Sequence, residues 1–263
     1  KELGIKYQAT SNKYNGGKNV MTWYDAMWQN VRGYVLPKLE RELPPDLYYH
    51  GVHHTRDDVV LAAERLAAEV GLDAEASLLL KTAAIYHDTG FLKRYIRNEP
   101  IAAEFAKETL PRFGFMPYQI AAIAGMIMAT QLPQSPRTQL EALMCDADLD
   151  ALGRSDFWGV NCDLRRERVA RGYEISMIEW LKNQIQFLES HTYFTLAAHS
   201  TRYAQKQRNL SMLKQMLHIS RANQELTLQD ITELKPWQKL GATLQTTFAI
   251  ESPAAYQTTP ATA

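Results

Sequence analysis

The sequence predicts an all-α fold, and three observations support this prediction. Between about residue 59 and residue 219, apolar side chains recur at spacings of three and four, the period of an amphipathic helix. No segment shows the apolar–polar alternation that marks a half-buried strand. No glycine-rich phosphate loop of the Rossmann or Walker type is present. We therefore expect a helical bundle without a sheet.

The first three expected helices lie in the amino-terminal half. Residues 59–70 carry an apolar stripe, and Gly71 supplies a stop signal. Residues 74–86 are apolar nearly all round, which predicts a buried central helix closed by Gly90. Residues 101–113 are amphipathic.

Four more helices are expected in the remainder of the chain. Residues 117–130 form a second buried helix, with proline at its first turn. Residues 137–150 begin polar and become apolar. Residues 165–190 and 200–219 read as two long amphipathic helices, which would allow a homodimer.

Length and composition limit the classes of protein to consider. The chain has 263 residues, and its 29 basic and 29 acidic side chains balance, which argues against a nucleic-acid polymer or an anionic membrane as partner. The longest mostly apolar stretch, residues 120–132, is shorter than the roughly 20 residues that cross a bilayer. Cys145 and Cys162 are too few for a disulfide framework and fit a reducing, cytoplasmic compartment.

We expect one helical domain over residues 20–242, preceded by an arm or linker at residues 1–19 and followed by a tail at residues 243–263. The arm is rich in Asn, Gly and Lys, and the tail in Thr, Ala and Pro. Neither has the apolar periodicity of an independent fold.

Histidine and carboxylate side chains gather at four places where predicted helices begin or end. These are residues 49–55, with three histidines, the pair His87–Asp88, the pair Asn98–Glu99, and residues 145–150, with three aspartates. Residues 78–85 are mostly apolar, so Asp88 should emerge from a buried helix. Burying an ionised carboxylate costs several kcal/mol unless a cation or hydrogen-bond donors compensate it. The pattern predicts a metal site, with a capping role for Asp88 as the alternative.

The three aspartates of residues 145–150 cannot all bind one ion. Asp146 and Asp150 are four residues apart and share a helix face, whereas Asp148 points to the other side. One face would bind the metal, and the other would be solvated or cap a neighbour. The spacing alone does not say which.

Together these pieces resemble the HD-domain superfamily of metal-dependent phosphohydrolases, which has a histidine at a helix start, a contiguous His–Asp and a later aspartate. The resemblance covers residues 49–153, and the helices to about residue 218 look like the usual continuation. The segment Tyr49-His50-x-x-x-His54 is similar to a motif of class I cyclic-nucleotide phosphodiesterases, which share that fold. The strings HDTGFL, MIMATQLPQSP and CDADLDALG resemble a bacterial branch of predicted HD phosphohydrolases.

The resemblance implies a role for individual residues. It makes His54, His87, Asp88 and Asp148 the metal ligands, with Asp146 as the alternative to Asp148. His50 would be the general acid that protonates the leaving oxygen, and Asp88 would also hold the attacking water. His53 would take no part.

Two imidazoles and two carboxylates suit a divalent transition metal, namely Mn²⁺, Fe²⁺, Co²⁺, Ni²⁺ or Zn²⁺. One ion is expected rather than two. The bacterial branch carries His-Glu where this chain has Asn98-Glu99, and asparagine is a poor ligand for such metals. A further histidine of dinuclear relatives is also missing near Ala129–Thr130. Glu99 would instead reach a water or the substrate.

The expected activity is hydrolysis of a phosphomonoester or phosphodiester of a small phosphorylated molecule, in particular a nucleotide or cyclic nucleotide, by attack of metal-bound hydroxide on phosphorus. Lys81, Arg56, Lys93 and Arg94 are candidates to hold the phosphate, although such side chains usually face water. Aromatic and histidine side chains could stack on a base or belong to the core; they are Tyr95, Phe157, Trp158, Phe187, His191 and Phe194. The arginine run over residues 165–171 is read mainly as a solvated face, and only weakly as a polyphosphate grip.

Two alternatives use the same residues differently. A non-catalytic HD module would bind a metal or a nucleotide and regulate a neighbouring domain. A di-iron oxygenase would need about six metal-binding side chains, two more than the four assigned above.

Overall fold

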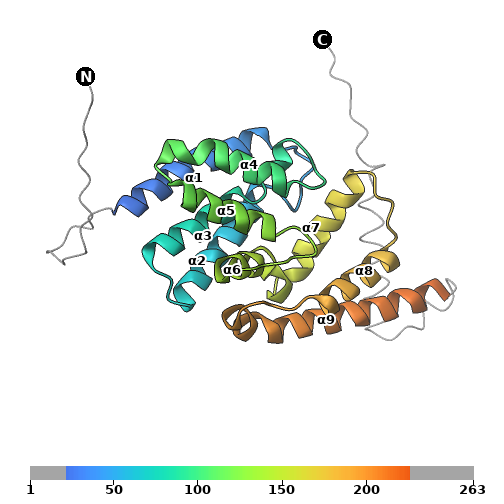
Figure 1. Ribbon diagram of the computed structural model, residues 1–263. Coiled ribbons are helices and arrows are strands. Elements are labelled where there is room, and N and C mark those ends of the chain that lie inside the picture. Colours follow the sequence, from blue (N-terminus) through green and yellow to red (C-terminus); the bar gives the residue numbers. More distant parts are fainter. Residues whose placement is uncertain (1–21, 226–263) are drawn as a thin grey trace, which may run out of the picture.

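The computed structural model describes residues 22–225, and it confirms the all-α class: this part of the chain contains helices and no strand (Figure 1). The predicted arm at residues 1–19 and tail at residues 243–263 lie outside the described residues. So does the end of the predicted helical domain, beyond residue 225.

The α-helices are α1 Trp23–Glu42, α2 Val60–Glu69, α3 Ala74–Tyr86, α4 Glu99–Thr109, α5 Pro117–Ala129, α6 Gln139–Asp148, α7 Phe157–Ala170, α8 Met177–Ser190 and α9 Leu196–Glu225. Four short turns adjoin them: the π-helical η1 His54–Val59 and the 3₁₀ turns η2 Thr89–Leu92, η3 Leu110–Phe113 and η4 Asp150–Gly153.

Short polar side chains begin several of these helices, because they accept the backbone N–H groups that a first turn leaves free. Asp73 accepts a hydrogen bond from Ala76 N at 2.8 Å and so starts α3. Reciprocal capping boxes start α1, α6 and α8, with Thr22, Thr138 and Ser176 as the capping residues.

The structure differs from the sequence prediction at several helices, and α9 extends beyond the predicted residues 200–219 at both ends. The single helix expected over residues 165–190 is two helices, because Gly172 adopts a left-handed backbone with φ of 84° and ends α7. The helix expected from residue 59 begins one π-helical turn earlier, at His54. Helix α1, for which the pattern predicted no bounds, spans 20 residues.

Two apolar clusters hold the bundle together. Helix α3 lies in the middle of the first cluster and contacts α1, α2, α5 and α6. The second cluster joins η4 and α7 to the antiparallel pair α8 and α9 (Figure 1). Its buried members are Leu152, Phe157, Leu181, Leu188, Leu210 and Leu213. Helix α6 and turn η4 connect the two clusters, and the candidate site forms at this junction.

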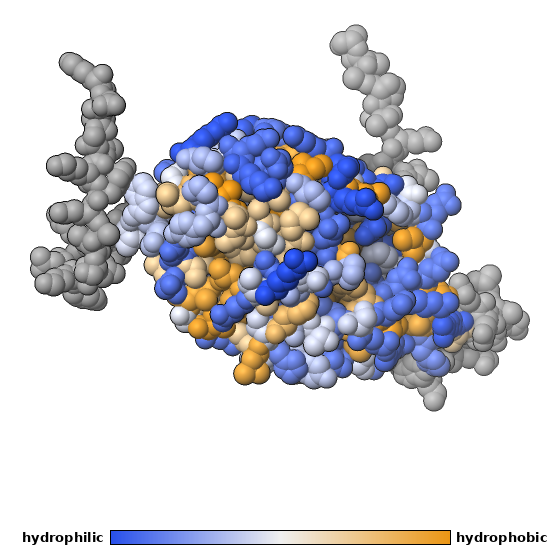
Figure 2. All heavy atoms as spheres, in the orientation of Figure 1, coloured by the Kyte–Doolittle hydropathy of each residue, from blue (hydrophilic) through white to orange (hydrophobic). Residues whose placement is uncertain are grey.

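In Figure 2, hydrophilic side chains dominate the top and the right of the molecule, whereas hydrophobic side chains gather toward its left half, where Figure 1 draws α3 and α5. Within residues 22–225, no helix combines the length and the hydrophobicity that a bilayer crossing requires.

Candidate metal centre

Three helix ends bring the predicted ligands together. His54 begins η1, His87 directly follows the buried helix α3, and Asp148 is the last residue of α6. The two histidines are buried, and Asp148 is half-buried. Asp88, next to His87, is buried as well.

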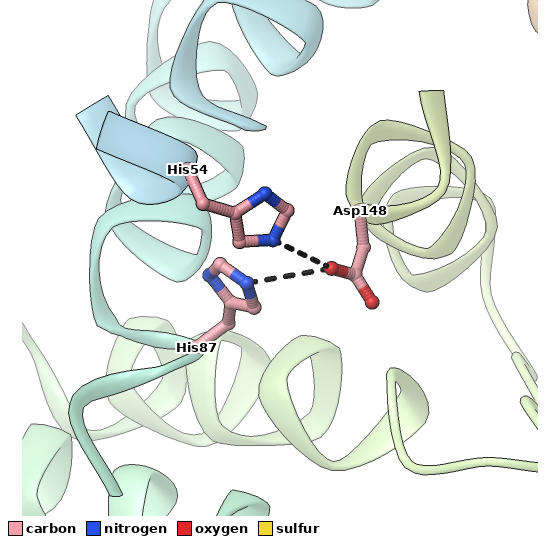
Figure 3. Close-up of side chains that lie close together, drawn as sticks. All are labelled: His54, His87 and Asp148. Atoms are coloured by element: carbon pink, nitrogen blue, oxygen red, sulfur yellow. Dashed lines mark ion pairs between the residues drawn. The ribbon is translucent and has the colours of Figure 1, made fainter. Parts of the chain in front are cut away.

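One imidazole nitrogen of each histidine faces the same carboxylate (Figure 3). His54 Nε2 lies 3.6 Å and His87 Nε2 lies 3.4 Å from Asp148 Oδ1. Asp88 Oδ2 lies 3.1 Å from His87 Nε2 and 3.7 Å from His54 Nε2. The ligand atoms of His54, His87 and Asp148 all lie within 4.8 Å of one another. This group could hold a metal ion.

The spacing and protonation of these atoms suit a metal. Ligand atoms about 2.1 Å from a shared ion lie about 3.0 Å apart at octahedral angles and about 3.4 Å apart at tetrahedral angles. His87 Nδ1 donates to Ala84 O at 2.7 Å, so Nε2 is the nitrogen left to bind a cation. His87 Nε2 and Asp88 Oδ2 are buried and have no hydrogen-bond partner among the described residues. A cation between them would satisfy both.

The electrostatics of the group favour positive charge. Burial lowers the pKa of His54, but the nearby carboxylates of Asp148 and Asp58 outweigh it and raise that pKa to about 9. Burial also lowers the pKa of His87, but the Asp88 carboxylate raises it. The net result is a pKa well above the usual value of a histidine. A cation that binds these nitrogens must displace their protons, so its affinity should rise with pH.

The other two aspartates of the α6 region have structural roles. Asp146 accepts the backbone N–H groups of Phe194 and Thr195 at 2.8 Å each and thereby orders the start of α9. Asp150 accepts Arg65 at 2.6 Å and Arg202 at 2.7 and 2.8 Å. The structure therefore places Asp148, and not the alternative Asp146, beside the histidines.

Gly90 determines how closely the third predicted segment approaches the His–Asp pair. A Cβ atom at Gly90 would lie 2.0 Å from the backbone oxygen of Asn98, so only glycine allows η2 to pack against the start of α4. This packing brings Asn98 and Glu99 to the wall of the same cavity as His87 and Asp88. Asn98 Oδ1 and Glu99 Oε2 are buried without a hydrogen-bond partner in the described part of the chain. Burial raises the pKa of Glu99.

A cavity of about 220 Å³ opens beside the candidate ligands, and the second apolar cluster contributes to its wall. Polar groups of the site line part of its wall, including His50, His87, Asp88, Glu99 and Asp148. The rest of the wall is largely apolar and comes from Leu132, Leu149, Ala151, Leu152, Phe157, Val160, Leu164 and Phe187. Of the predicted aromatic lining, Phe157 and Phe187 are in this wall, whereas Phe194 is 46% exposed.

Glu167 of α7 holds His50 in place. Its Oε1 accepts His50 Nδ1 at 2.6 Å and Tyr95 Oη at 2.8 Å, and its Oε2 accepts the backbone N–H groups of Tyr49 and His50 at 2.9 Å each. Burial raises the pKa of Glu167, but the hydrogen bond and charge of His50 outweigh it and lower that pKa to about 2. Glu167 is thus an ionised acceptor, which makes His50 Nδ1 the donor and leaves Nε2 for a ligand.

A chain of hydrogen bonds fixes the orientation of an amide at the cavity wall. The indole N–H of Trp180 can only donate, and it donates to Asn161 Oδ1 at 2.7 Å. The Asn161 amide nitrogen therefore donates to Gln184 Oε1, also at 2.7 Å. Asn161 and Gln184 both line the cavity. The Gln184 amide nitrogen bonds none of the described residues, so the wall offers a donor there.

The structure places the predicted phosphate-binding cations away from this cavity. Lys81 faces Glu64 at 3.9 Å and the Trp28 ring, and Arg56 pairs with Asp57 and Glu40. Lys93 and Arg94 are exposed, and so is His53. Of the five predicted substrate contacts, Glu99 is in the cavity wall.

Arg168 is the arginine in that wall, although the sequence suggested a mainly solvated face for its segment. Its guanidinium lies 5.9 Å from the Tyr95 ring centre and 5.3 Å from that of Tyr173. Within residues 22–225, it pairs with no carboxylate. Neither Glu167 nor Arg168 carried a local sequence signal beyond the arginine run.

Comparisons of the chain with models of protein families, with curated proteins and with solved structures found no match. The resemblance to HD-domain phosphohydrolases therefore stays a prediction from the motifs.

Proposed function

We propose that this protein is a metal-dependent phosphohydrolase of the HD type, which acts on a small phosphorylated molecule of the nucleotide class. One observation carries the proposal: two imidazoles, two carboxylates and an oriented histidine meet beside a cavity whose wall is largely apolar. His54, His87, Asp88 and Asp148 would hold one divalent transition-metal ion. Such an ion lowers the pKa of a bound water and polarises a phosphoryl oxygen.

His50 supplies proton transfer in this proposal. The centre of its ring lies 5.8 Å from that of His54, which puts it next to the metal ligands. Because Glu167 binds Nδ1, proton transfer takes place at Nε2, on the edge of the ring away from Glu167. Glu167 keeps the ring oriented, and the Nε2 proton would go to the leaving oxygen of the phosphate ester.

The remaining wall fits the rest of a nucleotide. Arg168 lines the cavity as a cation without a carboxylate partner among the described residues, so it is available to a phosphate oxygen. The apolar side chains would cover a flat ring, and the Gln184 N–H would donate to an acceptor on its edge. Glu99 would accept a hydrogen bond from a water or from the substrate.

The test is a hydrolysis screen of mononucleotides, cyclic nucleotides and chromogenic phosphate esters, each with Mn²⁺, Co²⁺, Ni²⁺, Fe²⁺ and Zn²⁺. We expect turnover with at least one metal and its loss in Asp88→Ala. Activity that survives Asp88→Ala would place the chemistry elsewhere. Binding of metal and nucleotide without turnover would instead support the non-catalytic regulatory module. Two iron atoms per chain with oxygen consumption would support the oxygenase.

A further inference from the structure

The two candidate histidine ligands are supported differently. His87 Nδ1 donates to the backbone oxygen of Ala84 at 2.7 Å, so helix α3 itself holds this ring. His54 Nδ1 is buried and has no hydrogen-bond partner among residues 22–225. Figure 3 shows one ring nitrogen of His54 facing Asp148 and the other directed away from it. The second nitrogen needs an acceptor if the first is to bind a metal.

Asp58 is the carboxylate placed to be that acceptor. Its Oδ2 lies 3.8 Å from His54 Nδ1, one turn further along the same segment. A small movement of either side chain would close this gap to a hydrogen bond. The Asp58 side chain is 17% exposed, so the pair is sheltered from water.

Arg154, which lies on the segment that follows Asp148, binds the Asp58 carboxylate. Its Nη1 donates to Asp58 Oδ1, which leaves Oδ2 for His54. Arg154 directly follows η4, a few residues after Asp148, so this ion pair ties the segment of one candidate ligand to that of another. The opposite edge of the guanidinium binds Asp156, with Nε to Oδ1 at 2.9 Å.

We propose that Asp58 and Arg154 are positioning residues for the metal centre: Arg154 holds the Asp58 carboxylate where it accepts the Nδ1 proton of His54, which keeps Nε2 aimed at the ion. The inference rests on the proposed function, because it needs a metal at His54. It concerns metal affinity rather than substrate contact. Asp58 and Arg154 line a second cavity, of about 660 Å³, and not the cavity beside His50 and Gln184.

The test is a competition titration of Co²⁺ and Zn²⁺ against a chelating dye, with the chelator-treated protein and without substrate. Loss of an outer hydrogen-bond partner typically weakens metal binding about 10- to 100-fold, and we expect this for Asp58→Ala. Asp58→Asn keeps an acceptor oxygen and should recover part of the affinity. Arg154→Gln should weaken binding less than Asp58→Ala, and Arg154→Lys should restore part of it.

Asp156→Asn is the matched control, because it removes an ion pair of Arg154 without removing the one to Asp58. Its metal affinity should stay within about twofold of wild type, while its thermal unfolding without metal serves as the reference for the loss of an ion pair. The proposal is overturned if wild type binds the metal, His54→Ala loses it, and Asp58→Ala binds as tightly as wild type. It is also overturned if Asp156→Asn and Arg154→Gln weaken binding equally. A wild-type protein that binds neither metal would overturn the proposed function together with this inference.

Discussion

Glu167→Gln separates the proposed support of His50 from simple packing, because the two side chains have nearly the same shape. The glutamine oxygen can keep the two backbone hydrogen bonds to Tyr49 and His50. Its amide nitrogen then meets two donors, His50 Nδ1 and Tyr95 Oη, where the carboxylate accepted both. Two hydrogen bonds to a buried, ionised acceptor are therefore lost.

Two independent magnitudes give the loss of folding free energy in Glu167→Gln. Hydrogen bonds to charged groups contribute about 1.5 kcal/mol or more each, which gives about 3 kcal/mol for the pair. The pKa of Glu167 falls from 4.5 to about 2 in the folded protein, which corresponds to about 3 kcal/mol of stabilisation near neutral pH. Glu167→Gln should thus raise the unfolding constant roughly 100-fold.

Urea unfolding of the chelator-treated protein measures this difference, as a lower midpoint with an unchanged slope. Because the folded-state pKa is depressed, the contribution is present above pH 4.5 and is lost as the pH falls toward 2. The gap between wild type and Glu167→Gln should therefore close in that window. Tyr95→Phe is the control, since it removes one of the four hydrogen bonds and should cost about 1–2 kcal/mol.

The same variant should lower kcat about 100-fold or more while metal binding is retained, because the His50 ring loses the carboxylate that accepts from Nδ1 and orients Nε2. A folded Glu167→Gln protein with wild-type stability at pH 7 would refute the account of this hydrogen-bond network. Wild-type kcat would refute the assignment of His50 as the acid.

Three further predictions concern other parts of the bundle. Gly90→Ala puts a Cβ atom 2.0 Å from the backbone oxygen of Asn98, the residue before α4. It should lower the stability by about 1–3 kcal/mol and weaken metal binding; a wild-type urea midpoint would contradict this. Trp180→Phe removes the donor that, through Asn161, orients Gln184. The ratio of kcat/KM between keto and amino bases should therefore fall toward unity, with little loss of kcat on the better base. An unchanged ratio would exclude this role of the hydrogen-bond chain. Burial lowers the pKa of His191 from 6.5 to about 4, so the protein should lose up to about 3 kcal/mol of stability as the pH falls between those values. His191→Phe should flatten that loss, and an unchanged pH profile would show that other groups cause it.

The sequence predicts most of the bundle because its helices carry their own boundaries. Helix α3 has the predicted bounds, since a capping aspartate and an apolar run define it locally. Helix α5 agrees to within one residue, because a proline at its first turn and an apolar run define it locally. The break between α7 and α8 was missed, although Gly172 with its positive φ ends the first helix and the capping box at Ser176 begins the second.

The candidate metal centre was predictable because each ligand stands at the end of a recognisable helix. Helix spacing alone did not choose between Asp146 and Asp148, since Asp146 is taken up by the backbone of Phe194 and Thr195, far along the chain; the resemblance favoured Asp148, which is the aspartate beside the histidines. Glu167 was missed because its bond to His50 spans 117 residues and leaves no trace in local sequence. Arg168 was not singled out because the sequence alone does not show which arginine of the run over residues 165–171 lines the cavity.

Metal stoichiometry of a matched pair of variants tests the central claim most directly. Asp148→Asn and Asp146→Asn make the same chemical change two residues apart, and asparagine is a poor transition-metal ligand. By equilibrium dialysis against Co²⁺ or Zn²⁺ followed by elemental analysis, wild type and Asp146→Asn should bind one equivalent and Asp148→Asn much less. Equal binding by the two variants, or none by wild type, would contradict a metal centre at His54, His87 and Asp148.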